Sequence, residues 1–176
     1  LSSFCLLGAL STYNSTPETA SRPFDATRNG FVLGEGAAFL ILEEWDKAKA
    51  RGARIYAELA GEGNSLSSYR ITDSHPNGDG AIQAIERALQ DAGVQASDVD
   101  YINAHGTSTK MNDLSETNAI KAVFGESVAN LPVSATKSQT GHLISAAGAL
   151  QAVLSVKSIE QAHVPKTANL TIADPE

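Results

Sequence analysis

The chain has 176 residues, of which 42% are hydrophobic and 19% charged, the balance of a globular protein rather than of a disordered one. Thirteen basic and twenty acidic side chains give a net charge of −7 at pH 7, which argues against a nucleic-acid surface. The one cysteine, Cys5, excludes an internal disulfide framework and a cysteine zinc site, and it fits a reducing compartment such as the cytoplasm.

The first part of the chain predicts loops, short strands and one helix. Two apolar runs flank Gly34-Glu35-Gly36, a pattern typical of two strands, or one bent strand, around a tight turn. The expected elements are a surface loop over 11–29, strands over 31–33 and 37–42, a helix over 45–51 that ends at Gly52, and a strand from Ile55.

The second part predicts strands that alternate with helices. The expected elements are a helix over 81–92, a strand over 99–104, a helix over 114–124, a strand over 131–135 and an apolar helix over 141–161. The apolar stretch over 143–156 is shorter than the roughly 20 residues that a membrane span needs, so we expect no span. The alternation indicates an α/β fold with both sheet faces covered.

Two of these strands run into loops that carry titratable side chains. The strand over 99–104 leads to His105, and the strand over 131–135 leads to Lys137 and His142. Because ligands of α/β sheets bind beyond the carboxyl ends of the strands, the three side chains form a candidate active site. The four histidines show no paired spacing that would suit zinc, so no metal site is expected.

His142 is expected to open the apolar helix over 141–161. At the positive end of a helix dipole, and in an apolar surround, the imidazolium form is disfavoured. A neutral imidazole there can donate a hydrogen bond to a carbonyl oxygen that gains negative charge.

Three sequence runs resemble the β-ketoacyl-ACP synthases of fatty-acid and polyketide synthesis. They are SRPFDATRNGFVLGEGAAFLILEE, NAHGTST and TKSQTGHLISAAGA, in that order. The resemblance implies a thiolase-like fold with αβαβα layers, present as an incomplete copy, because both ends of the chain look cut. Residues 1–52 are then the end of the N-terminal half, and residues 53–176 are the truncated C-terminal half.

The resemblance also implies a reaction and the residues that carry it. An acyl chain is held on a cysteine of the first half, while His105 and His142 polarise a malonyl thioester so that CO₂ leaves and an enolate forms. Lys137 shapes the electrostatics around His105. Asp113 and Glu116 are supporting acidic residues, with Glu116 as the expected lysine partner.

Substrates and partners follow from the same resemblance. Thr107 and Thr109 correspond to hydroxyls that hold the pantetheine arm, which arrives on the acyl carrier protein, so no resident cofactor is expected. Malonyl and acyl thioesters are the expected substrates. The full-length protein is expected to be a cytoplasmic homodimer.

The sequence departs from the family pattern at two places. Gln151 stands where many relatives carry a glutamate near the lysine, which puts the lysine network in doubt. The nucleophilic cysteine is absent, because Cys5 lies only a few residues before Ala9-Leu10-Ser11-Thr12 and is expected to be a small buried hydrophobe. The fragment alone is therefore expected to be inactive.

Two other functions compete with the condensing enzyme. A chain-length-factor-like partner, which dimerises with an active synthase and catalyses nothing, would have the same fold. A penicillin-recognising serine acylase is suggested by Ser134-x-x-Lys137 and Tyr101-x-Asn103. The order of these motifs is wrong for that class, and Ser134 is expected in a strand rather than at a helix start.

Overall fold

The computed structural model describes residues 2–70 and 73–175. Its α-helices are α1 Ser2–Leu6, α2 Trp45–Ala50, α3 Asp79–Ala92, α4 Lys110–Phe124, α5 Lys137–Thr140 and α6 Ala147–Gln161, and its strands are β1 Ile102–Asn103 and β2 Val133–Ser134. Short 3₁₀ turns lie at Pro17–Thr19, Ala96–Asp98, Gly125–Asn130 and Ile144–Ala146.

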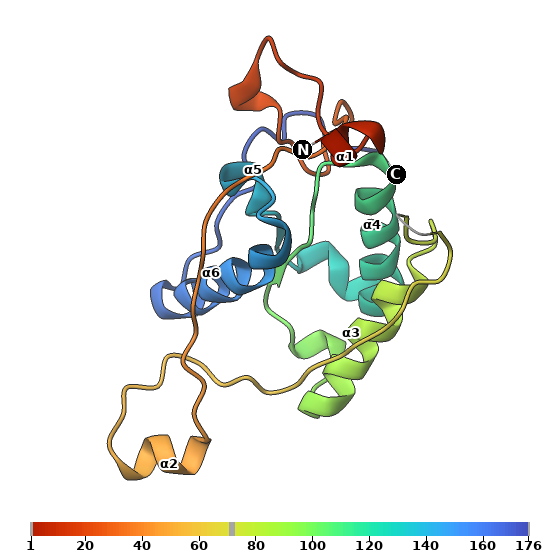
Figure 1. Ribbon diagram of the computed structural model, residues 1–176. Helices are drawn as coiled ribbons and strands as arrows, with labels where there is room; N and C mark the ends of the chain where they lie inside the picture. The colour runs from red at the N-terminus through yellow and green to blue at the C-terminus, as the bar shows by residue number, and fades with distance from the viewer. Residues whose placement is uncertain (1, 71–72, 176) are drawn as a thin grey trace.

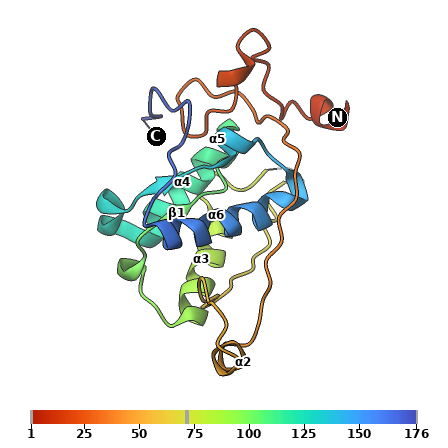
Figure 2. The ribbon, with the colours of Figure 1, turned by 90° about the vertical axis from the view of Figure 1, so that its left-hand side faces the viewer.

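A parallel pair of strands lies between two helical layers. Ile102 pairs with Val133 and Asn103 with Ser134, so the carboxyl ends of β1 and β2 meet at one edge. The helix α6 lies on one side of this pair, and α3 and α4 lie on the other (Figures 1 and 2). The predicted α/β arrangement of two helical layers around parallel strands is thus present in this part of the chain.

The apolar core lies between α3, α4 and the pair of strands. Ile120, Phe124 and Leu131 are buried, and Ile85 of α3 and Val133 of β2 pack against them. The helix α3 presents an apolar face at the predicted spacing and ends at Gly93, whose φ of +68° is the left-handed conformation that glycine favours. The side chain of Thr109 caps α4 by accepting a hydrogen bond from the Asn112 N–H.

The strands predicted over 31–33, 37–42 and from Ile55 are not formed as ladders. Phe31 and Leu33 make single bridges, to Leu10 and His142, whereas residues 37–42 and 55–64 have no strand partner among the described residues. A strand needs a neighbouring backbone to bond to, and apolar composition alone does not supply one. These segments form an extended arm that leads to α2 and back (Figure 1).

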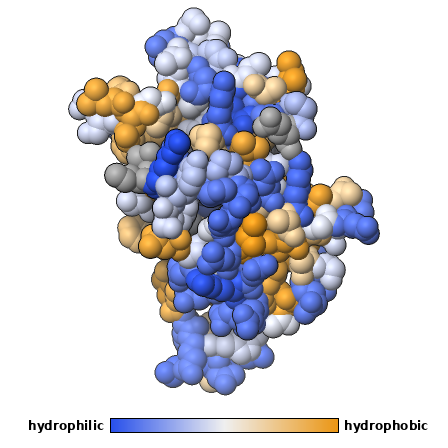
Figure 3. Space-filling view, turned by 90° about the vertical axis from the view of Figure 1, so that its right-hand side faces the viewer, coloured by the Kyte–Doolittle hydropathy of each residue, from blue (hydrophilic) through white to orange (hydrophobic). Residues whose placement is uncertain are grey.

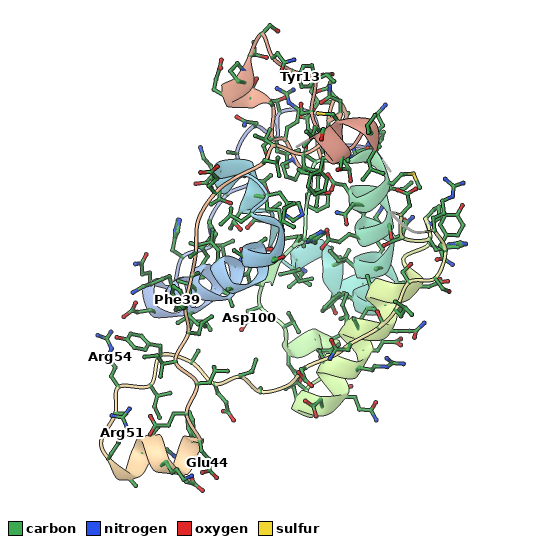
Figure 4. All side chains as sticks on the ribbon, viewed as in Figure 1. Tyr13, Phe39, Glu44, Arg51, Arg54 and Asp100 are labelled. Carbon is green, nitrogen blue, oxygen red and sulfur yellow. The ribbon has the colours of Figure 1, made fainter. Side chains whose placement is uncertain are left out.

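The arm carries apolar side chains into solvent. Phe39 is 90% exposed and Ile41 is 95% exposed. Figure 4 shows Phe39 on the descending part of the arm and Glu44 and Arg51 at the two ends of α2, away from the helical layers. On the face viewed in Figure 3, apolar patches interrupt a mainly hydrophilic surface.

Two further predictions about local structure are wrong. The helix expected over 141–161 begins at Ala147, because Gly141 has a φ of +70° and the chain turns there. The Gly34-Glu35-Gly36 run is not a tight turn. A Cβ on Gly34 would lie 2.2 Å from the carbonyl oxygen of Thr140, so the glycine permits a close approach of two backbones instead.

Cys5 is exposed on α1, so the expectation that it is buried is also wrong. The helix α1 contributes no buried residue, and its ring contact with the rest of the chain is made by Phe4 against Phe31. Of the helices within the described ranges, none has the length and apolar character that crossing a membrane requires.

Candidate active site

The two loops that follow β1 and β2 bring His105, Lys137 and His142 together. The ring centroids of His105 and His142 are 5.4 Å apart, and the rings are nearly perpendicular at 86°. Nζ of Lys137 lies 3.3 Å from Nδ1 of His105. The three residues singled out from the sequence therefore form one cluster, at the sheet edge where parallel strands end.

Two carboxylates of α4 hold the loop that carries His105. Glu116 accepts the backbone N–H groups of His105 at 2.6 Å and Gly106 at 2.8 Å. Asp113 accepts those of Thr107 at 3.1 Å and Ser108 at 3.2 Å. Four consecutive backbone donors thus point at two carboxylates one helical turn apart, which fixes the start of the loop relative to α4.

Asp113 is itself held by the loop at residues 21–28. Its Oδ2 accepts the Phe24 N–H at 2.9 Å and lies 3.3 Å from Nε of Arg28. Asp113 is 1% exposed, and burial raises its pKa, although the hydrogen bonds and the charge of Arg28 act in the opposite direction. Arg28 extends the connection, because it also pairs with Asp174.

Lys137 is 2% exposed, and its ammonium group uses all three of its N–H donors. Besides Nδ1 of His105, it donates to the backbone oxygen of His105 at 2.5 Å and to Oε1 of Gln151 at 2.6 Å. Burial lowers the pKa of Lys137 to about 8, although the charges of Glu116 and Asp113 act in the opposite direction.

Glu116 is not the direct lysine partner that the sequence suggested. Its carboxylate is occupied by the backbone N–H groups of His105 and Gly106, and no ion pair joins it to Lys137 within the described residues. Glu116 instead acts on Lys137 through its charge, and it positions His105 through the backbone. Burial raises the pKa of Glu116, although its two backbone hydrogen bonds oppose this shift.

The hydrogen bonds assign a tautomer to His105. Since the Lys137 ammonium can only donate, Nδ1 of His105 accepts, and the proton of the neutral ring lies on Nε2. Part of His105 remains open to solvent. Even so, burial, followed by the charges of Lys137 and His142, lowers the pKa of His105 to about 4. The ring is therefore a neutral Nε2–H donor at pH 7.

His142 is also a neutral Nε2–H donor. Its Nδ1 accepts the Ile144 N–H at 3.0 Å, and α6 begins only at Ala147. Burial, and then the charge of Lys137, lowers the pKa of His142. The backbone of His142 is fixed by its N–H, which donates to the oxygen of Val32 at 2.7 Å, and by its ring, which packs 5.2 Å from that of Phe31.

The two threonines expected to hold a pantetheine arm lie beside each other in the first loop. Their hydroxyl oxygens are 2.9 Å apart. Thr107 is buried, and Thr109 is half-buried and caps α4, so each has a structural contact in this chain. Their expected role in substrate binding is not tested by these contacts.

The sequence did not reveal the residues that support the site through hydrogen bonds and ion pairs. Arg28 and Asp25 lay inside a recognised motif, but no role was given to them. Asn103 opens the recognised NAHGTST run and also belongs to the rival motif, but no role in the site was predicted for it, although it hydrogen-bonds to Gln151 of α6. The signal available was the position of Asn103 at the end of a strand, two residues before His105.

The arrangement suits stabilisation of an oxyanion without a metal. Two neutral imidazoles can each present an Nε2–H to one oxygen on which charge develops. In the described ranges, no three His, Cys, Asp or Glu side chains gather as a metal site. Ser134 is buried in β2 and its hydroxyl bonds to Tyr101 at 2.8 Å, while Lys137 bonds elsewhere, so the serine acylase pair is not formed.

An α/β fold with a His–Lys–His cluster at the carboxyl edge of parallel strands defines the class of the condensing enzymes. Two family models match the chain. Residues 56–171 match the β-ketoacyl synthase C-terminal domain, and residues 1–48 match the β-ketoacyl synthase N-terminal domain. The chain belongs to the β-ketoacyl synthase family.

Individual relatives agree with this assignment. The chain is 48% identical over all 176 residues to 3-oxoacyl-[acyl-carrier-protein] synthase 2 of Staphylococcus aureus (strain COL), and it covers 42% of that protein. It is 50% identical over 173 residues to the enzyme of the same name from Synechocystis, covering 98% of this chain and 42% of that one.

A solved structure gives the fold. A type II polyketide ketosynthase, in complex with its acyl-carrier protein and bound to a hexaketide, superposes with a TM-score of 0.96 at 44% identity. The superposition covers 99% of this chain and 43% of that one. The predicted family and thiolase-like fold are confirmed, and the chain spans less than half the length of these relatives.

Proposed function

We propose that this chain is the enolate-forming part of a β-ketoacyl-ACP synthase, which carries out the decarboxylative Claisen condensation of malonyl-ACP with an enzyme-bound acyl chain. The observation that carries the proposal is the pair of neutral imidazoles, His105 and His142, with ring centroids 5.4 Å apart. The relatives named as 3-oxoacyl-ACP synthases support it, and their greater length means that the activity belongs to a longer protein.

The chemistry follows from what two neutral donors can do. The thioester oxygen of the malonyl group accepts hydrogen bonds from both Nε2–H groups. The bond between the α-carbon and the carboxylate breaks, and CO₂ leaves. The electron pair of that bond stays on the α-carbon and forms the enolate. The enolate carbon then attacks the acyl thioester on a cysteine, and the cysteine thiolate leaves as the new carbon–carbon bond forms.

Lys137 keeps His105 in the form that this reaction needs. Because Lys137 donates to Nδ1, His105 keeps its proton on Nε2, which faces away from the lysine. Asp113 and Glu116 support the step indirectly, since they hold the backbone of the His105 loop.

The other molecules of the reaction are proposals as well. Phosphopantetheine arrives on an acyl carrier protein, and Thr107 and Thr109 contact its arm. The solved polyketide ketosynthase is bound to its acyl-carrier protein, which supports this partner. A homodimer in the cytoplasm is the assembly and location that we propose, and the matched ranges 1–48 and 56–171 support a division of the chain at residue 52.

A chain-length-factor-like partner is the alternative function. Retention of His105, Lys137 and His142 in one hydrogen-bonded cluster favours a catalyst over a silent partner, because a partner that catalyses nothing has no use for the cluster. The nucleophilic cysteine is proposed to lie in the part that the longer relatives have and this chain does not. Cys5 lies on the exposed helix α1 and is not a candidate.

The proposal is tested with the full-length protein, using malonyl-ACP and an acyl-ACP. We expect release of CO₂ and formation of a β-ketoacyl-ACP, and a chain-length-factor-like partner would give neither. The 176-residue chain alone should form no covalent acyl-enzyme. Acylation of the chain that disappears in the variant Cys5→Ala would contradict the assignment of the nucleophile.

A further inference from the structure

Arg28 is a buried cation, 4% exposed, whose guanidinium reaches the start of α4. Its Nε donates to the backbone oxygen of Thr109 at 3.4 Å, and its Nη2 donates to that of Lys110 at 3.2 Å. Nε also lies 3.3 Å from Oδ2 of Asp113, and Nη1 donates to the backbone oxygen of Asp25 at 3.0 Å. A planar guanidinium holds several acceptors in fixed directions, which a point charge does not.

We propose that Arg28 is a positioning residue of the site, which fixes residues 107–109 and thereby the two hydroxyls that receive the pantetheine arm. This inference deepens the proposed function and rests on the substrate contacts proposed there for Thr107 and Thr109. Arg28 touches no reacting atom. It acts through the carboxylate of Asp113 and through the backbone of Thr109.

The two carboxylates of α4 divide the loop after β1 between them. Glu116 accepts the backbone N–H groups of residues 105 and 106, and Asp113 accepts those of residues 107 and 108. In the part of the chain that the structure describes, Arg28 pairs with Asp113 and not with Glu116. The cation therefore acts on the half of the loop that carries the threonines rather than on the half that carries the histidine.

Ser108, which lies between the two threonines, is fixed by the same segment that carries Arg28. It is buried, and its φ of +69° is a left-handed conformation that residues other than glycine rarely adopt. Its Oγ accepts the N–H of Arg22 at 3.1 Å, and its backbone oxygen accepts that of Gly30 at 2.9 Å. Such a conformation persists only where the surrounding contacts hold it, so residues 22–30 fix the turn between the threonines.

The charge of Arg28 also keeps Asp113 in the form that accepts hydrogen bonds most strongly. Burial raises the pKa of Asp113, and the charge of Arg28 acts against this shift. Without the cation the carboxyl group would gain a proton more readily, and a protonated carboxyl group accepts backbone N–H groups more weakly. A lysine at residue 28 would keep the charge but would lack the fork that reaches two backbone oxygens together.

The test uses the full-length protein with the variants Arg28→Met and Arg28→Lys. The matched control is Arg51→Met, the same change at a side chain that is 63% exposed at the end of α2 (Figure 4). Decarboxylation is measured with malonyl-ACP and with malonyl methyl thioester, which has the malonyl group but no pantetheine arm. The dissociation constant of pantetheine is measured separately, so that binding is followed without turnover.

In Arg28→Met we expect the KM for malonyl-ACP to rise about tenfold with kcat unchanged, as for the loss of one hydrogen bond with a charged group. The dissociation constant of pantetheine should rise by a similar factor. Decarboxylation of malonyl methyl thioester should proceed at the wild-type rate, because that substrate has no arm to bind.

The other two variants grade this result. Arg28→Lys should raise the KM for malonyl-ACP about threefold, since the charge remains and the fork is lost. Arg51→Met should match the wild type in all three measurements.

An equal loss with malonyl-ACP and with malonyl methyl thioester would overturn the inference, because Arg28 would then support the whole site and not the threonines. An unchanged KM and an unchanged pantetheine dissociation constant would overturn it as well. Should Arg28→Met fail to fold, Arg28→Lys decides alone. If the wild-type protein does not decarboxylate malonyl-ACP, the proposed function fails, and the pantetheine dissociation constants of the variants still decide whether Arg28 positions the threonines.

Discussion

Residues 30–34 and residues 37–42 belong to one continuous segment of similar apolar composition, yet their surroundings are opposite. Phe31 is 7% exposed and lies between the rings of Phe4 and His142. Phe39, eight residues later, is 90% exposed. The backbone differs in the same way. The N–H of Phe31 donates to the backbone oxygen of Ala9, and the N–H of Gly34 donates to that of His142.

The contrast shows that this chain buries apolar residues where another segment of the chain hydrogen-bonds to their backbone. Residues 30–34 lie against the loop that carries His142, and the active site is therefore held by contacts within the chain. Residues 37–42 have no such partner in the described part of the chain, and their apolar side chains face solvent. The Staphylococcus aureus relative that is 48% identical to this chain is more than twice as long.

The largest expected effect compares the two phenylalanines directly. Phe31→Ala should lower the free energy of unfolding of the 176-residue chain by about 3–5 kcal/mol, the range for a buried aromatic ring. Phe39→Ala should change it by less than about 0.5 kcal/mol, as expected for an exposed site. Urea titration followed by circular dichroism measures both, and equal losses would remove the contrast between the two segments.

A smaller effect is expected at Asp25, which ties the loop before residue 30 to the C-terminal segment. Its Oδ2 accepts the backbone N–H groups of Thr171 at 2.8 Å and Ile172 at 2.9 Å. Asp25→Asn should cost about 2–3 kcal/mol at pH 7, because hydrogen bonds to a charged acceptor are lost. Asp100→Asn, at an exposed site labelled in Figure 4, is the matched control and should be neutral.

The Asp25 prediction also has a pH dependence with a defined sign. Burial acts to raise the pKa of Asp25. Hydrogen bonds from Ile172, Thr27 and Thr171 nevertheless hold that pKa well below its usual value of 3.8. The stabilisation is therefore present above about pH 4 and lost as the pH falls toward the lower, folded-state value. The difference between wild type and Asp25→Asn should shrink in acid, and a constant difference would contradict the assignment.

The smallest effect concerns the pH limit of the reaction in the full-length protein. Since burial lowers the pKa of Lys137 to about 8, the lysine loses a proton above that pH and no longer fixes the tautomer of His105. Decarboxylation of malonyl-ACP should fall about fivefold between pH 8 and pH 9, whereas the wild-type fold persists. A single-turnover rate that is flat up to pH 10 would show that the lysine charge is not needed.

Much of the site could be predicted because it depends on local order along the chain. His105 follows β1, and Lys137 and His142 follow β2, so parallel pairing alone brings their loops to one edge. The helices α3 and α4 were expected from their apolar spacing. These features need no knowledge of distant contacts.

The parts that the sequence did not reveal depend on contacts between distant segments. The neutral form of His142 was expected from an apolar surround and from a helix start at residue 142. Burial does lower its pKa, but the charge of Lys137 also contributes, and α6 begins only at Ala147. Glu116 was expected to pair with the lysine, although backbone N–H groups occupy its carboxylate. In both cases the residue was identified but only part of the physical cause was, because the competing partners lie elsewhere in the chain.

The central claim is that His142 donates to the developing enolate and takes no part in acyl transfer. The most direct measurement compares both steps in the full-length protein with His142→Ala and with His163→Ala, an exposed histidine, as control. The account predicts that His142→Ala slows malonyl-ACP decarboxylation about 10²–10³-fold, as for one lost oxyanion donor, with acylation of the cysteine unchanged. Decarboxylation at the wild-type rate in His142→Ala would contradict it.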